Sequence, residues 1–143
     1  MQPSMGVGAR LLPLAPSGYK RGVPLRRMLN ELTARAAGAR GAVLCDYDGE
    51  FVELVVVDPA LSAYDMKVAG AQIAAVWAGL QSGSIDSGAG GILELRLGCD
   101  GGTLLCRTLR DGYYLVLLLA RGTPSAPAAF ALRRTASAMA AEL

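Results

Sequence analysis

The sequence contains no histidine. Histidine is a frequent general base and the commonest metal ligand, so a histidine-dependent active site and the mixed zinc sites are excluded. Only three cysteines occur, and no two of them form a C-x-x-C pair, so we expect no metal and no cofactor. Cys99 and Cys106 flank a predicted turn, but thiols in apolar sequence are more often core residues, and whether this pair ever forms a disulfide stays open.

Long hydrophobic runs are also missing, although 52% of the residues are apolar. Arg121 ends the run that begins at Tyr113, and Gln72 interrupts the one from Ala69 to Leu80, so neither can cross a bilayer. The N-terminus lacks the basic start and the sustained apolar stretch of a secretory signal. We therefore expect a cytoplasmic protein without a transmembrane segment, and 143 residues suffice for one well-packed domain.

Charge is spread unevenly along the chain. Up to Arg40 there are seven basic residues against Glu31 alone, whereas the rest carries seven basic and eleven acidic residues. A basic arm could contact nucleic acid, anionic lipid or an acidic protein, but aromatic residues are almost absent among these charges, so we predict no nucleic-acid partner. Residues 1–22 are rich in glycine and proline without a sustained period. We predict a flexible basic extension there, followed by one domain over residues 23–143.

Three segments have helical periodicity. The first begins near Pro24 and ends at Gly38, the second spans Ser62–Gln81, and the third lies within residues 127–143. Ser62 with Asp65 three residues later resembles a capping box. The second helix is apolar nearly all round, so it should be buried on two sides, with its alanines against another helix. These alanines are Ala71, Ala74, Ala75 and Ala78.

Five further segments have the composition of β-strands. Residues 41–58 form two of them around an Asp-rich turn, and Gly91–Ala120 forms a three-stranded meander whose Asp-Gly turns tolerate positive φ. Tyr113–Leu119 is apolar on both faces and should be central. The order αββαβββα therefore predicts an α+β fold, with a five-stranded antiparallel sheet of order 2-1-5-4-3 and helices on both faces.

This strand order leaves Gly91–Leu97 at one edge, where its leucines are open to pairing. Such an edge promotes aggregation unless it is covered, either by a two-fold partner or by a loop of the same chain. With the axis near Leu95, Glu94 would lie opposite Arg96 of the partner. The predicted dimer interface joins the alanines of the second helix to Ile92, Leu93, Glu94, Leu95, Arg96 and Leu97.

No catalytic motif accompanies these elements. The sequence lacks a G-x-S-x-G elbow, a G-K-[ST] phosphate loop and a complete dinucleotide fingerprint. Asp46 and Asp48 flank a hairpin, where aspartates usually shape the turn. Arg40 and Arg110 are expected on loops, and we take them with Lys67 as candidate partner contacts. These observations favour a non-enzymatic binding or regulatory module.

Several segments resemble the Roadblock/dynein light-chain superfamily, and in particular its bacterial MglB-like members. The likeness lies in residues 37–44, the Asp46–Glu50 hairpin, the second helix AYDMKVAGAQIAAVWAGL and residues 109–114 before the last strand, and it covers residues 24–143. The resemblance implies a dimer, with itself or a paralogue, joined through the third strand and the second helix. It also implies a Ras-like small GTPase as partner, activated or scaffolded without an inserted arginine finger.

The leading hypothesis is a dimeric, non-enzymatic regulator of a prokaryotic Ras-like small GTPase. The basic extension and the long valine-rich second strand depart from the bacterial pattern. The alternative is a structural adaptor dimer that recruits a larger assembly without affecting nucleotide turnover, and an enzyme or small-ligand sensor is the third possibility.

Overall fold

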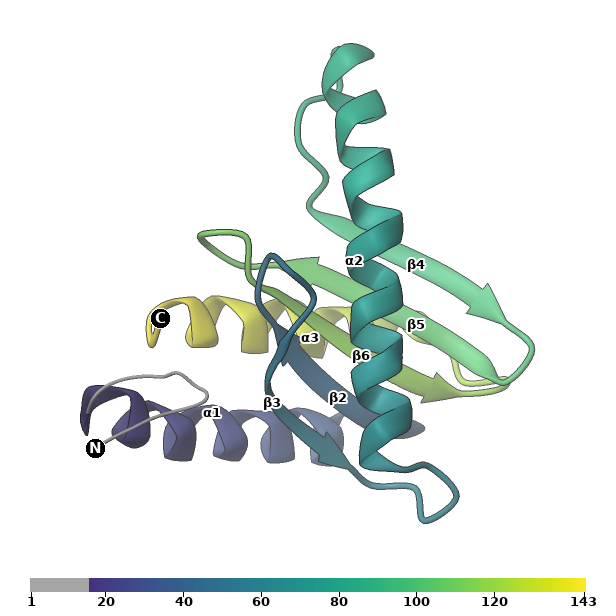
Figure 1. Ribbon diagram of the computed structural model, residues 1–143. Coiled ribbons are helices and arrows are strands. Elements are labelled where there is room, and N and C mark those ends of the chain that lie inside the picture. Colours follow the sequence, from purple (N-terminus) through teal and green to yellow (C-terminus); the bar gives the residue numbers. More distant parts are fainter. Residues whose placement is uncertain (1–15) are drawn as a thin grey trace.

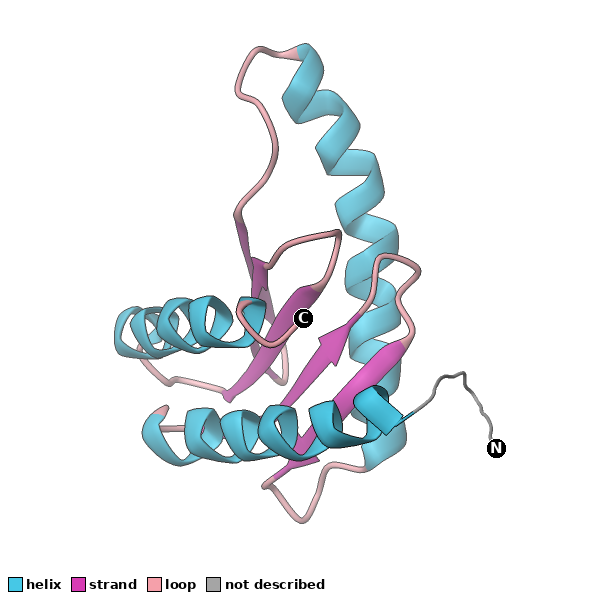
Figure 2. Cartoon of the chain, turned by 90° about the vertical axis from the view of Figure 1, so that its left-hand side faces the viewer, coloured by secondary structure: helices cyan, strands magenta, loops and turns pink. Residues whose placement is uncertain are grey.

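The computed structural model describes residues 16–143, which form three layers with a sheet in the middle (Figures 1 and 2). One helix, α2 (Ala63–Asp86), covers one face of the sheet. Two helices, α1 (Pro16–Arg35) and α3 (Ser125–Ala140), lie side by side on the other face. The element order is αββαβββα, which confirms the predicted fold class. No helix within the described residues is long and apolar enough to cross a membrane.

The sheet has five antiparallel strands in the order β3-β2-β6-β5-β4, which is the predicted order 2-1-5-4-3. The middle strand, β6, is buried or half-buried along its whole length because both of its faces are covered. β3 and β4 form the two edges. The strands are β2 (Ala39–Cys45), β3 (Phe51–Val56), β4 (Glu94–Cys99), β5 (Gly102–Thr108) and β6 (Tyr114–Ala120).

Two hydrophobic clusters join the layers. Alternate residues of β6 point to opposite faces of the sheet, as the two-residue period of a strand requires. Leu117 packs in the cluster formed with α1 and α3, which also includes Leu29 and Leu132. Val116 packs in the cluster beneath α2, which includes Met66. The inward side of α3 carries Leu132, Ala136 and Met139, which are buried.

α1 begins earlier than the sequence predicts. We expected the helix to start near Pro24 and residues 1–22 to be a flexible extension, but α1 starts at Pro16 and Pro24 lies inside it. Proline cannot donate to the helical ladder, and it therefore suggests a helix start, yet its fixed φ is itself helical and the chain continues through it. Residues 1–15 of the predicted extension lie outside the described residues.

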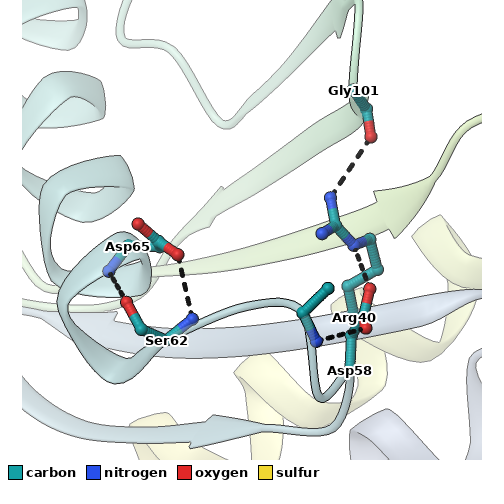
Figure 3. Close-up of polar contacts among 6 residues, drawn as sticks. Arg40, Asp58, Ser62, Asp65 and Gly101 are labelled. Carbon is teal, nitrogen blue, oxygen red and sulfur yellow. Dashed lines mark hydrogen bonds and ion pairs between the residues drawn. The ribbon is translucent and has the colours of Figure 1, made fainter.

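α2 ends later than the sequence predicts. We expected a helix over Ser62–Gln81 followed by a loop, but α2 continues to Asp86, and its last turns project beyond the sheet (Figure 1). A glycine costs a helix about 1 kcal/mol, which is too little to stop one that is already nucleated. The predicted capping box is confirmed, because the Ser62 hydroxyl accepts from the Asp65 amide at 3.0 Å and the Asp65 carboxylate accepts from the Ser62 amide at 2.9 Å (Figure 3).

Candidate interaction surface on α2 and β4

α2 covers only part of its face of the sheet. It packs mainly against β2 and β3, which leaves the β4 end of this face less covered. Leu95 and Leu97 of β4 and Leu104 of β5 belong to this face and are half-buried. We call these three residues the β4 shelf. The shelf adjoins the outer hydrogen-bonding edge of β4, which has no neighbouring strand on that side among the described residues.

Exposed apolar side chains on α2 and just before β4 extend this surface. Val76 is 40% exposed, Leu80 is 45% exposed and Leu93 is 62% exposed. Soluble monomers seldom gather large apolar side chains next to an unpaired strand, and such a combination is typical of an interaction site. The predicted interface residues Leu93 and Leu95 therefore lie on the open part of the molecule.

The alanines of α2 do not all share one environment. Ala71, Ala75 and Ala78 are exposed. Ala74 is half-buried against the β2–β3 turn, so close to Gly49 that a Cβ added to this glycine would lie 2.9 Å from the Ala74 methyl group. Ala74 thus packs within its own chain, while the other three alanines remain available to a partner.

A groove of about 510 Å³ lies between α2, the segment before β4 and the hairpin turns. Two of its lining residues, Trp77 and Tyr114, stack with their ring centroids 6.4 Å apart and their planes 8° from parallel. Tyr47, Ile92 and Leu109 contribute from the surrounding loops. This groove was not predicted from the sequence, in which Trp77, the one tryptophan of the chain, was the only residue that pointed to it.

The charged residues of β4 are paired within the chain. Glu94 accepts a hydrogen bond from Arg133 of α3 at 2.9 Å and lies 3.0 Å from Arg107 of the neighbouring strand. The hydrogen bond from Arg133 is the main reason why the pKa of Glu94 is lowered. Arg96 donates to Ser125 at 3.0 Å. A pair between Glu94 and Arg96 of a partner would therefore compete with these contacts.

The candidate partner contacts Arg40, Arg110 and Lys67 are not brought together. Arg40 lies in β2 and not on a loop, and it donates to the Asp58 carboxylate at 2.7 Å and to the Gly101 carbonyl at 3.3 Å (Figure 3). The hydrogen bond from the amide of Ala60, followed by the one from Arg40, lowers the pKa of Asp58.

Arg110 is exposed in the turn after β5, at the opposite end of that strand from Gly101. The ammonium group of Lys67 lies 4.3 Å from the centre of the Phe51 ring. These three cations therefore form no common site.

The aspartates of the β2–β3 hairpin shape the turn. The Asp46 carboxylate accepts from the Asp48 amide at 2.9 Å and from the Glu50 amide at 3.1 Å. This confirms the interpretation made from the sequence. Among residues 16–143 there is no group of three or more potential metal ligands.

The thiols differ in burial and do not form the pair considered above. Cys99 is exposed and opposite Gly102, whereas Cys106 is buried and opposite Leu95. Burial raises the pKa of both Cys45 and Cys106 to about 12, so these two thiols are unreactive at neutral pH.

Known proteins resemble this chain in structure. No family model and no curated protein matches it. The gliding protein MglB from Thermus thermophilus superposes with a TM-score of 0.76 and 20% identity, over 95% of this chain and 97% of that one. An MglB with a tetrameric arrangement superposes with a TM-score of 0.77 and 21% identity, over 95% of this chain and 96% of that one. The Roadblock/LC7 domain from Streptomyces avermitilis superposes with a TM-score of 0.69 and 18% identity, over 79% of this chain and 92% of that one. The chain therefore has the Roadblock/LC7 fold.

Proposed function

We propose that this chain is a regulatory module without catalytic activity of its own, which pairs with a second copy or a paralogue and, as a dimer, binds a Ras-like small GTPase. The observation that carries the proposal is the open edge of β4 beside the β4 shelf and the exposed apolar side of α2. A strand added to this edge would satisfy the free backbone groups of β4, and a helix added beside α2 would bury Val76 and Leu80.

The GTPase partner is proposed from the fold and from the lack of chemistry in this chain. Solved MglB structures superpose on nearly its whole length. Histidine is absent from the sequence, and the described residues hold no cluster suited to a metal. A protein of this kind acts by binding, and it would speed hydrolysis only by positioning groups that the GTPase supplies. Exposed Lys67 and Arg110 remain candidate contacts to it.

The test uses the small GTPase encoded nearest to this gene. Binding, phosphate release and nucleotide exchange are measured with and without the full chain. Faster phosphate release or exchange supports a regulator, whereas binding with unchanged rates supports the structural adaptor. Absence of binding contradicts the proposed regulator of this GTPase.

Replacement of an exposed arginine separates a scaffold from a donor of catalytic groups. We expect Arg110→Ala to keep any stimulation within about twofold, since an arginine that acts on the γ-phosphate in trans contributes about 10³-fold or more. Single-turnover phosphate release at saturating protein measures the difference. A loss of about 10³-fold with binding retained would identify Arg110 as such a finger.

A further inference from the structure

The layer formed by α1 and α3 has a net positive charge, whereas the rest of the described chain has a net negative charge. The two helices contain seven basic residues against one acidic residue, Glu31, a formal charge of +6. Residues 36–124 and 141–143 carry six basic and eleven acidic residues, a formal charge of −5. The basic residues of the layer whose side chains the structure describes are Arg26, Arg27, Arg35, Arg133 and Arg134. Folding thus collects on one side of the sheet charges that are far apart in the sequence.

Part of this charge is not neutralised by the protein. Arg26 pairs with Glu53 and Arg133 with Glu94, at the flanks where α1 meets β3 and α3 meets β4. Among the side chains that the structure describes, the exposed Arg27, Arg35 and Arg134 have no ion-pair partner. These three arginines therefore present cationic groups to whatever approaches the layer.

An exposed aromatic residue accompanies the arginines. Phe130 of α3 is 60% exposed, and the guanidinium carbon of Arg134 lies 5.9 Å from the centre of its ring. The other exposed residues on this helix include the small side chains of Ala126 and Ala138. A flat surface that contacts α3 would therefore meet the Phe130 ring and the Arg134 guanidinium together.

We propose that the α1/α3 layer binds the surface of an anionic lipid bilayer. Its two adjacent helices form one side of the molecule, as a planar membrane requires (Figure 2). The free arginines match the negative surface potential of anionic headgroups, and Phe130 enters the interfacial region, where aromatic rings are favoured. A nucleic-acid backbone would satisfy the arginines but would leave the phenyl ring without an apolar partner.

The test is flotation of the full chain with vesicles. Vesicles of phosphatidylcholine alone are compared with vesicles containing about one third phosphatidylserine. We expect binding to the anionic vesicles only, and release when salt is raised from about 0.1 M to about 1 M, which shortens the Debye length from about 10 Å to about 3 Å. Glycerophosphoserine, which carries the headgroup without acyl chains, should not compete.

Charge-reversal variants locate the surface. The double variant Arg27→Glu with Arg134→Glu should weaken binding to anionic vesicles by about tenfold or more. Phe130→Ser should weaken the same binding severalfold. The control combines Arg110→Glu with Arg121→Glu, which changes net charge equally at two exposed turn positions outside the layer and should retain most of the binding. Circular dichroism verifies that each variant is folded.

Three results would overturn the proposal. The first is equal binding to neutral and anionic vesicles, and the second is an equal loss of vesicle binding in the layer variant and in its control. The third is that the chain binds soluble polyglutamate but not vesicles, which would identify an acidic protein as the partner. None of these measurements involves the GTPase, so this proposal stands or falls separately from the proposed function.

Discussion

Gly70 allows α2 to approach the sheet closely. A Cβ at this position would lie 2.5 Å from the sulfur of Cys45, nearer than real Cβ contacts come. The carbonyl of the same residue accepts a hydrogen bond from the Tyr114 hydroxyl at 2.9 Å. The missing side chain thus sets the distance between helix and sheet, and with it the position of one ring of the groove.

Two glycine substitutions in α2 should have opposite effects. We expect Gly70→Ala to lower the free energy of unfolding by about 1–3 kcal/mol, because the methyl group overpacks against Cys45. In Gly79→Ala no atom lies within 4 Å of the new methyl group, so this substitution should raise the free energy of unfolding by up to about 1 kcal/mol. Urea denaturation measures both. A stabilising Gly70→Ala would disprove the close contact.

Glu94 should contribute stability that is lost in acid. Its pKa is lowered in the folded protein, first by the hydrogen bond from Arg133, so its contribution is complete above the ordinary pKa of 4.5 and disappears as pH falls through the folded value. We expect Glu94→Gln to lower the free energy of unfolding at neutral pH by about 1 kcal/mol or less, since the group is partly exposed.

The comparison is urea denaturation of wild type and Glu94→Gln at several pH values between about 7 and 3. The two curves should converge at the acid end. Glu142→Gln, which removes a carboxylate that has no ion-pair partner among the described residues, serves as the control. A difference between wild type and Glu94→Gln that persists at low pH would show that packing, and not charge, explains the loss.

At the scale of elements, one hydrogen bond ties the end of α2 to the start of the β4 edge. The Gln81 side-chain oxygen accepts from the Ile92 amide at 2.8 Å. This bond holds the segment before β4 against the last turns of a helix that projects beyond the sheet (Figure 1). The shape of the groove therefore depends on it, because both residues line the groove.

Removal of this bond should loosen the segment without unfolding the domain. We expect Gln81→Ala to speed amide hydrogen exchange at Ile92 by about tenfold, while the free energy of global unfolding changes by about 1 kcal/mol or less. Gln72→Ala, at an exposed position of the same helix, is the control and should leave this exchange unchanged. Unaltered exchange in Gln81→Ala would mean that other contacts hold the segment.

The sequence predicted the strands better than the helix ends. The two-sided apolar pattern of β6 required cover on both faces, and the turn after β5 has positive φ at Asp111 and Gly112, as its residues suggested. Helix ends at Pro24 and near Ser82 were misjudged because a single proline or glycine does not always end a helix that is already nucleated.

Contacts between elements could not be predicted in the same way. The pairs of Arg133 with Glu94 and of Arg40 with Asp58 depend on tertiary distances that no local pattern encodes. The open edge of β4 followed from strand order alone, so this part of the candidate surface was predictable. The groove was not, since it depends on how far the segment before β4 stands from Trp77.

At the scale of the whole molecule, substitutions at the two sheet edges distinguish the proposed interface from non-specific hydrophobic association. We expect Leu95→Arg on the β4 shelf to convert dimers into monomers. Val52→Arg should leave the mass unchanged, although Val52 is 40% exposed on the opposite edge strand. Light scattering during size exclusion measures both. Ala74→Glu is less informative, because this alanine packs against Gly49 and the variant would also disturb folding.

The position of β4 at the sheet edge determines the polarity of the proposed dimer. When two copies of an edge strand pair antiparallel in one continuous sheet, the dyad that relates them stands perpendicular to the sheet. Such an operation does not turn either subunit over. Both α1/α3 layers would then point the same way, their net positive charges would add, and both grooves would open on the reverse side. The dimer would be a two-sided plate whose electric dipole turns the layers toward a negative surface and leaves the α2 side free for a protein.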